Sequence, residues 1–199
     1  MSSILNFGIN FSDKKWYIVL RDILFLFIVY SICGWIYEEL VFILELNQVV
    51  NRGALFGPWL PIYGFGGLII ISLFYRFKDK KIMLGKLNIR PLVLFFETVI
   101  FATLVELVAT YLMDFTGGNF KSLWDYSNEF MNFEGRIALI PDLKFGIVAL
   151  VGIYFLEPLL IKFLSNKEQG LIDGLSVVIF MLFFVDAFAR IWLGNNFVG

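Results

Sequence analysis

Residues 91–113 read PLVLFFETVIFATLVELVATYLM, and the only charged residues in this stretch are Glu97 and Glu106. A helix needs about 20 mainly apolar residues to cross the ~30 Å hydrocarbon core of a bilayer. The stretch meets that requirement, and it lies between a basic segment and a segment rich in aromatic and polar residues. It therefore predicts a transmembrane helix and a fold built around the membrane.

Four further segments have the same character. Together they predict an all-α fold, an integral membrane bundle of about five transmembrane helices forming one transmembrane domain over residues 1–199. The second helix is the shortest, and Pro61 at its start both lacks an N–H group and disfavours a helical conformation at Leu60. We therefore expect its Pro/Gly-rich entry to be broken. The expected helices cover residues 19–46, 61–77, 91–113, 143–164 and 171–193, with a long extracellular loop over 114–142.

The composition supports this interpretation and excludes several classes of protein. Apolar residues make up 59% of the 199 residues and charged residues 17%, whereas soluble domains are about 45–50% apolar and a quarter charged. There is no His, and Cys33 is the only Cys, which excludes zinc fingers, His-dependent triads and disulfide frameworks within the chain. With a net charge of −1, nothing favours nucleic acid. We expect no metal or cofactor.

The basic residues predict an orientation. In a five-helix topology, the N-terminal segment and the segments after the second and fourth helices share one side and hold eleven of the 16 Lys and Arg residues. Cytoplasmic segments carry an excess of Lys and Arg. The N-terminus is therefore expected in the cytoplasm and the C-terminus outside.

Ionisable residues inside the expected helices are the first candidates for function, because each costs about 2.5–3.5 kcal/mol to insert into a membrane. In the predicted orientation, Glu38, Glu39 and Glu106 lie in the outer halves of their helices. Asp186 and Arg190 lie near the outer end of the last helix and are four residues apart, close enough to form an ion pair.

Glu106 is the carboxylate that we expect to be functional. It shares a stripe of the third helix with Thr103 and Thr110, and such a polar stripe should face a cavity and not lipid. Glu97 is nine residues away and falls on the opposite face at ~100° per residue. We interpret Glu97 as a packing or inner-interface residue.

Arginines on the outer side leave two interpretations of this charge cluster open. The charges could neutralise one another as ion pairs that fix the packing, with Arg52 at the mouth of the cavity neutralising at least one carboxylate. Alternatively, they could line an outward-facing polar cavity for a small polar, cationic or amine-bearing ligand. The long loop could be a lid for that cavity or a segment lying in the interface. The candidate ligand-binding residues are Glu38, Glu39, Arg52, Glu106, Trp124, Asp125, Tyr126, Arg136, Asp186 and Arg190.

Three motifs occur together in this chain: GWIYE at 34–38, NRGALFGPWLPIYGFG at 51–66, and WDYS at 124–127 followed by GRI at 135–137. In this order and membrane setting the chain resembles the type IV ABC-transporter (CmpB-like) family of bacterial multi-pass membrane proteins. The resemblance covers about residues 24–160 and implies a transport role, with Glu106 at the position of a glutamate of the family.

Three functions compete on this evidence. The first is a transporter component, a permease or substrate-capturing subunit, whose partners would be the lipid bilayer and a separate cytoplasmic ATPase, since the chain has no Walker-type loop. Assembly with further copies of the chain is left open. The alternative is a membrane scaffold or lipid-interacting protein whose buried charges are structural. An enzyme acting on lipid is not expected, because no nucleophile–base pair or metal motif supports it.

Overall fold

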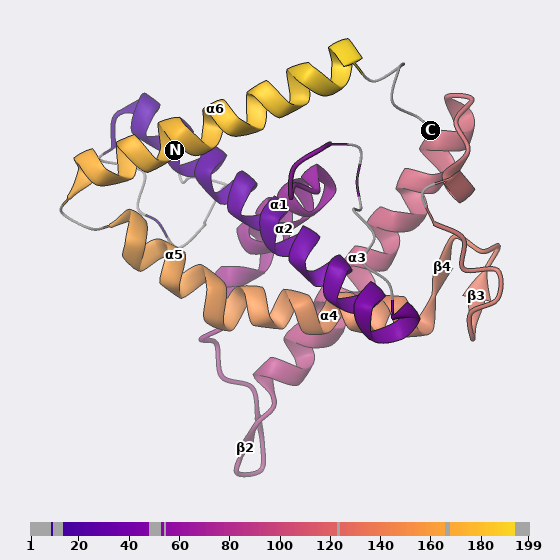
Figure 1. Cartoon of the computed structure of the whole chain (residues 1–199). Coiled ribbons are helices and arrows are strands. Elements are labelled where there is room, and N and C mark those ends of the chain that lie inside the picture. Colours follow the sequence, from indigo (N-terminus) through magenta and orange to yellow (C-terminus); the bar gives the residue numbers. More distant parts are fainter. Residues whose placement is uncertain are drawn as a thin grey trace. The chain divides into compact units, whose positions relative to one another are not determined.

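The structure is a computed structural model that describes residues 9, 14–47, 53, 55–122, 124–165 and 168–193. Helices dominate this part of the chain (Figure 1). Two short hairpins interrupt them, β1 Met83–Leu84 with β2 Leu87–Asn88, and β3 Asn132–Phe133 with β4 Ile137–Ala138. The helices are α1 Trp16–Leu46, α2 Pro61–Phe74 followed by the 3₁₀ turn η1 Tyr75–Phe77, α3 Arg90–Phe115, the 3₁₀ turn η2 Phe120–Ser122, α4 Leu139–Val151, the π-helical turn η3 Gly152–Leu156, α5 Glu157–Leu164 and α6 Gln169–Leu193.

The predicted all-α membrane fold is confirmed. Four helical spans of the described chain are long and apolar enough to cross a membrane, Trp16–Leu44, Arg90–Phe115, Leu139–Leu164 and Gln169–Leu193. The second expected helix is present at Pro61–Phe77, but it is shorter than the other four. Its entry is non-helical through Leu60 and becomes helical at Pro61, as expected from the loss of one N–H group there.

The chain divides into two compact units, Met1–Ser72 with Leu159–Gly199, and Leu73–Pro158. The first unit contains α1, most of α2, most of α5 and α6, and the second contains α3, α4, η3 and both hairpins. The single transmembrane domain expected from the sequence stays a prediction.

Small residues allow the helices of the first unit to approach closely. A Cβ atom on Gly34 of α1 would collide with the ring of Tyr63 in α2, and one on Gly64 would collide with Ser31 and Phe27 of α1. The backbone N–H of Leu60 also donates to the carbonyl of Ser31, at 3.1 Å. The entry to α2 is therefore fixed on α1 by backbone contact, which any side chain at either glycine would disrupt.

In the second unit, α3 packs against α4. Gly146 of α4 provides the close approach, since a Cβ atom there would collide with Val99 and Phe95 of α3. Helix α4 begins at Leu139, four residues before the expected start, with Pro141 in its first turn. Proline is tolerated there because the first N–H groups of a helix have no partner within the helix. This earlier start moves Asp142 from the expected loop into the helix.

A π-helical turn, η3, immediately precedes Glu157 and Pro158. Pro158 has no N–H group, and its ring would clash with the carbonyl four residues earlier in a regular helix. The widened turn Gly152–Leu156 lies where that clash would fall, and such turns are frequent at functional or strained positions. Glu157, next to it, is fully buried.

Candidate functional site

The structure distributes the predicted site residues between the two units. Glu38, Glu39, Asp186 and Arg190 belong to the first unit. The second unit holds the other predicted residues that the structure describes, together with several polar side chains that sequence reasoning missed. Arg52 lies outside the described residues, so its expected pairing stays a prediction. The predicted site residues of the second unit are Glu106, Trp124, Asp125, Tyr126 and Arg136.

Two carboxyl groups meet inside the second unit. Glu106 projects from α3 and interacts directly with Asp142, which lies in the first turns of α4. Thr103, one turn before Glu106, interacts with Asp142, and Tyr126 of the following loop interacts with Glu106. The polar stripe predicted on α3 therefore faces α4 and the loop, and its partner is a second acid.

Among the described residues, part of this carboxyl pair has no hydrogen-bond partner. Asp142 is only 6% exposed, yet no described residue is hydrogen-bonded to its Oδ1 or to the buried Oε2 of Glu106. Within the described chain, neither carboxyl contacts a Lys or Arg side chain. Buried polar atoms are nearly always paired, and two facing carboxylates repel each other unless a cation or proton lies between them. The arrangement is suited to holding a positively charged group.

Sequence reasoning missed Asp142 because it assigned this residue to the loop. Pro141 was the available signal: proline is common in the first turn of a helix, so a helix start before it could have been predicted. With that start, Asp142 would have fallen within a membrane helix and joined the candidates.

The predicted loop residues fold against one another. Trp124 donates from Nε1 to the carbonyl of Arg136, at 3.0 Å, and the N–H of Tyr126 donates to the carbonyl of Gly135, at 2.9 Å. Gly135 has φ 69°, and a Cβ atom there would lie 2.5 Å from Ser127 Oγ and 2.8 Å from Asp125 Oδ1. The WDYS and GRI motifs therefore form one loop structure, which needs glycine at residue 135.

Asp125 has a local role in this loop. Its Oδ1 accepts hydrogen bonds from Ser127 Oγ at 2.5 Å and from the Ser127 N–H at 3.0 Å. These bonds favour the ionised carboxylate and lower the pKa of Asp125. In the described structure Asp125 stabilises the turn, and its expected role as a ligand-binding residue stays a prediction.

Arg136 is held by charges and rings at the end of α3. Its guanidinium contacts Asp114 at 2.5 Å and Glu134 at 3.0 Å, and it lies 4.3 Å from the ring centroids of both Tyr111 and Phe120. The hydrogen bond with Asp114 is the main contact that raises the pKa of Arg136, so the side chain stays charged. These contacts connect the loop to the C-terminal end of α3.

In the first unit, Asp186 contacts the entry to α2. Its carboxylate accepts hydrogen bonds from the N–H groups of Phe56 and Gly57, at 3.1 and 2.9 Å, and from Trp59 Nε1 at 2.6 Å. Asp186 and Arg190 are close enough in sequence to pair, but no ion pair joins them in the described structure. Arg190 instead lies over the Phe56 ring, 5.3 Å from its centroid, while three donors of the α2 entry bind the Asp186 carboxylate.

Glu38 and Glu39 also lie in the first unit, on α1. Glu38 accepts a hydrogen bond from the hydroxyl of Tyr63 in α2, at 2.8 Å. Glu39 is 6% exposed. The GWIYE motif thus contributes to the α1–α2 packing through both Gly34 and Glu38.

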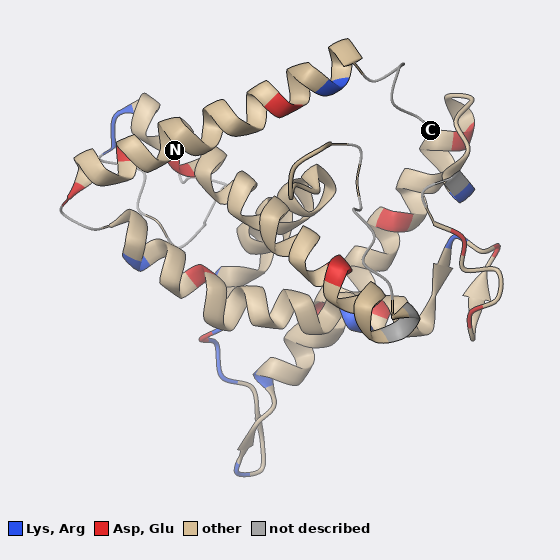
Figure 2. Ribbon diagram, in the orientation of Figure 1, with Lys and Arg blue, Asp and Glu red and all other residues tan. Residues whose placement is uncertain are grey.

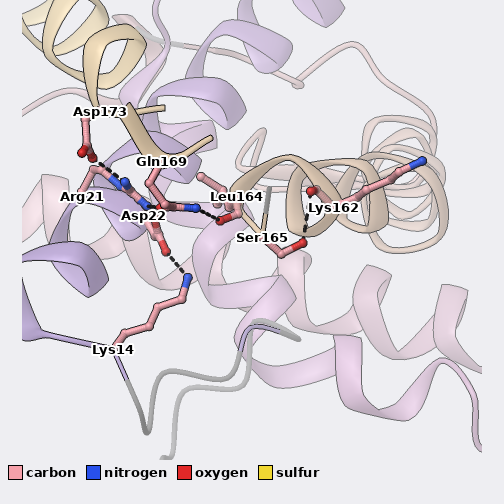
Figure 3. Close-up of polar contacts among 8 residues, drawn as sticks. All are labelled: Lys14, Arg21, Asp22, Lys162, Leu164, Ser165, Gln169 and Asp173. Atoms are coloured by element: carbon pink, nitrogen blue, oxygen red, sulfur yellow. Dashed lines mark hydrogen bonds and ion pairs between the residues drawn. The ribbon is translucent and has the colours of Figure 1, made fainter. Parts of the chain in front are cut away.

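A second charged cluster of the first unit was not predicted (Figure 3). Asp22 of α1 is fully buried and binds Lys14 Nζ at 2.7 Å and Arg21 Nη2 at 2.6 Å. Arg21 continues to Asp173 and to Gln169 Oε1 on α6, the latter at 2.9 Å. Arg21 is one of the eleven basic residues that predict the orientation, and nothing in the sequence singled out its neighbour Asp22 as its partner. The cluster connects the beginnings of α1 and α6.

Glu97 pairs with Arg90 on its own helix, at 2.9 Å. Arg90 is 5% exposed and also donates from Nε to the carbonyl of Phe77, at 2.8 Å. This ion pair agrees with the packing role expected of Glu97. Glu106, in contrast, faces another acid, Asp142.

The helices and these buried charge clusters define a multi-pass helical membrane protein. Its sequence matches a family model described as "Putative ABC-transporter type IV" over residues 25–191. The chain belongs to this family and is an ABC-transporter-related membrane protein. Neither a curated protein nor a solved structure matches it.

Proposed function

We propose that the chain is the permease or substrate-capturing subunit of a transporter, with an outward-facing polar site for a small cationic or amine-bearing ligand. The observation that carries the proposal is the Glu106–Asp142 pair. Two acids inside membrane helices, each with one buried oxygen that has no partner among the described residues, cost free energy, and a function would explain why they are retained. A cation between them would neutralise both charges and would provide the missing contacts.

The proposed orientation follows the positive-inside bias and places the N-terminus in the cytoplasm of a bacterial inner membrane. Helix α3 then runs outward, so Glu106 lies beyond its midpoint and Asp142 lies near the outer start of α4. The folded loop with Trp124 and Tyr126 follows α3 on the same side. The ligand would reach the carboxyl pair from outside, past Tyr126.

The energy for transport would come from a separate subunit. Membership of an ABC-transporter family implies an ATP-hydrolysing partner, and the sequence contains no phosphate-binding loop of the Walker type. We infer a cytoplasmic ATPase that works with this chain.

A structural role is the second candidate, because several predicted site residues are held by partners within the fold. Arg136 is held by two acids and two rings, and Asp186 by three donors. If the Glu106–Asp142 pair served only folding, the protein would be a membrane scaffold or lipid-interacting protein.

Cation-dependent stability distinguishes the two candidates. The purified protein would be heated with sodium, potassium, ammonium, ethanolamine, choline and spermidine as probes, and compared with Glu106→Gln and Asp142→Asn. The carboxyl-to-amide control on the same helix is Glu97→Gln. We expect at least one probe to raise the unfolding temperature of the wild type and of Glu97→Gln, and to lose this effect in the two site variants.

Equal stabilisation of the wild type and both site variants would show that the carboxyl pair is not the binding site. No stabilisation of any protein by any probe would favour the scaffold. If a probe does bind, uptake of that compound into cells expressing each variant then tests transport itself.

A further inference from the structure

The hairpin between η1 and α3 projects away from the end of α3 (Figure 1). Strands β1 and β2 pair with Met83 opposite Asn88 and Leu84 opposite Leu87. Gly85 is the first of the two loop residues and has φ 62°, which suits a two-residue hairpin turn of type II′. The hairpin is therefore an ordered structure outside the membrane spans. It contains none of the residues of the proposed ligand site.

The base of the hairpin is attached to membrane helices. Arg90 donates to the carbonyl of Phe77 at 2.8 Å, and the hydroxyl of Tyr154 donates to the carbonyl of Lys78 at 3.2 Å. Ile89 N–H also donates to the carbonyl of Ile82, at 2.8 Å. Because the base is fixed where the apolar span Arg90–Phe115 begins, the hairpin extends from the level of the membrane surface.

One face of the hairpin is apolar. Side chains alternate along a strand, and directly opposite residues lie on the same face. Leu84 and Leu87 therefore share one face, and they are 67% and 71% exposed. No described side chain covers this end of the face. Exposed bulky residues of this kind, outside the membrane spans, indicate an interaction surface.

The same segment is strongly basic, as the blue positions along the hairpin show (Figure 2). Lys78 is paired with Asp79 at 2.9 Å, and this bond raises the pKa of Lys78. Lys81 and Lys86 are exposed, and Lys80 lies over the Phe77 ring, 4.7 Å from its centroid. Positive charge beside an exposed apolar face matches the surface of an anionic bilayer, which supplies negative headgroups above an apolar layer.

We propose that this hairpin lies on the membrane surface, with Leu84 and Leu87 inserted among the lipids and the lysines bound to anionic headgroups. The partner is the lipid surface. A protein surface would need its own apolar patch beside acidic residues, whereas the bilayer is already present where the base of the hairpin is fixed. The hairpin would then set the position of α3, and with it Arg90, against the interface.

The test places an environment-sensitive fluorophore on single cysteines after Cys33→Ala. Leu84→Cys reports on the apolar face, and Met83→Cys, on the opposite face, is the matched control. Both positions are exposed, so labelling leaves the fold intact. Each protein is reconstituted in nanodiscs of phosphatidylcholine alone or mixed with phosphatidylglycerol, and quenching by a spin-labelled lipid is measured.

We expect quenching at residue 84 and little at residue 83, with stronger quenching in the anionic nanodiscs. Each lysine near an anionic surface favours binding roughly fivefold, so Lys81→Gln with Lys86→Gln should lower the ratio of embedded to exposed label about 25-fold. A water-exposed label at residue 84 in both lipids would overturn the proposal and point to a protein partner. Insertion that is independent of lipid charge would refute the role of the lysines.

Discussion

Removing the Asp186 carboxylate should destabilise the first unit more than any exposed charge would. This side chain accepts three hydrogen bonds from residues 56–59, at 2.6–3.1 Å. The Asp186→Ala variant leaves two backbone N–H groups and the indole of Trp59 without their acceptor. Trp59 is 7% exposed, so water cannot easily replace the lost oxygen at the indole.

The magnitude follows from the number of bonds and their exposure. A hydrogen bond to a charged group contributes about 1.5–3 kcal/mol. Phe56 is 44% exposed, so water can replace part of the loss at its N–H. We therefore expect Asp186→Ala to cost about 3 kcal/mol in total. For a chain of this length that lowers the unfolding temperature by roughly 6–12 °C. Asp186→Asn retains one acceptor oxygen and should cost about 1 kcal/mol.

The assay is thermal unfolding of the detergent-purified protein, followed by tryptophan fluorescence. Asp79→Ala is the control, because Asp79 is 80% exposed and its ion pair with Lys78 lies at the surface. Exposed pairs contribute about 0–1 kcal/mol. If Asp186→Ala unfolds at the same temperature as Asp79→Ala, the hydrogen bonds to the α2 entry do not stabilise the protein and our reasoning is refuted.

Three further outcomes are expected. Asp22→Asn removes the fully buried charge of the cluster with Lys14 and Arg21 and should cost at least about 3 kcal/mol in thermal unfolding, so wild-type stability would contradict the cluster's role. The pKa of Asp125 is lowered in the folded loop, so its contribution is complete above the unfolded pKa of about 3.9 and is lost as the pH falls through the lower folded value. Ser127→Ala should raise the pH of that transition, which Trp124 fluorescence would report; an unchanged midpoint would exclude the bond. In the Cys33→Ala background, an impermeant thiol reagent should label Glu129→Cys in intact cells and Lys86→Cys only after lysis. The reverse labelling pattern would show that the chain has the opposite orientation in the membrane.

The sequence alone predicted the helices well because the signal is local. A membrane span needs a long apolar run, so residues 91–113 could be recognised without knowing any neighbour. The close approach at Gly64 was also predictable, since small residues allow helices to touch. Helix ends were less certain: Pro141 was assigned to the loop, although proline is tolerated in a first helical turn.

The partners of the charges could not be predicted in the same way. Asp186 and Arg190 have the spacing of an ion pair, yet Asp186 binds residues 56–59, more than 120 residues away in sequence. Backbone N–H groups exist at almost every residue, so no sequence pattern identifies the ones that a carboxylate will meet. The pairing of Glu106 with Asp142 could not be predicted either, because it depends on how α4 packs against α3.

A stability measurement distinguishes a charge kept for folding from one kept for binding, and Glu106 is the sharpest case. Asp186 accepts three hydrogen bonds, so its removal can only destabilise the protein. Glu106 faces a second acid and retains a buried oxygen that has no partner in the described part of the chain. In Glu106→Gln, the amide can donate to Asp142 and one of two like charges is gone, so the ligand-free protein should gain up to about 1 kcal/mol. Retaining the glutamate at that cost is understandable if a cation binds there, since functional sites often reduce stability. Ligand-free thermal unfolding of Glu106→Gln beside Asp186→Asn tests this: a loss as large as that of Asp186→Asn would make Glu106 a structural residue.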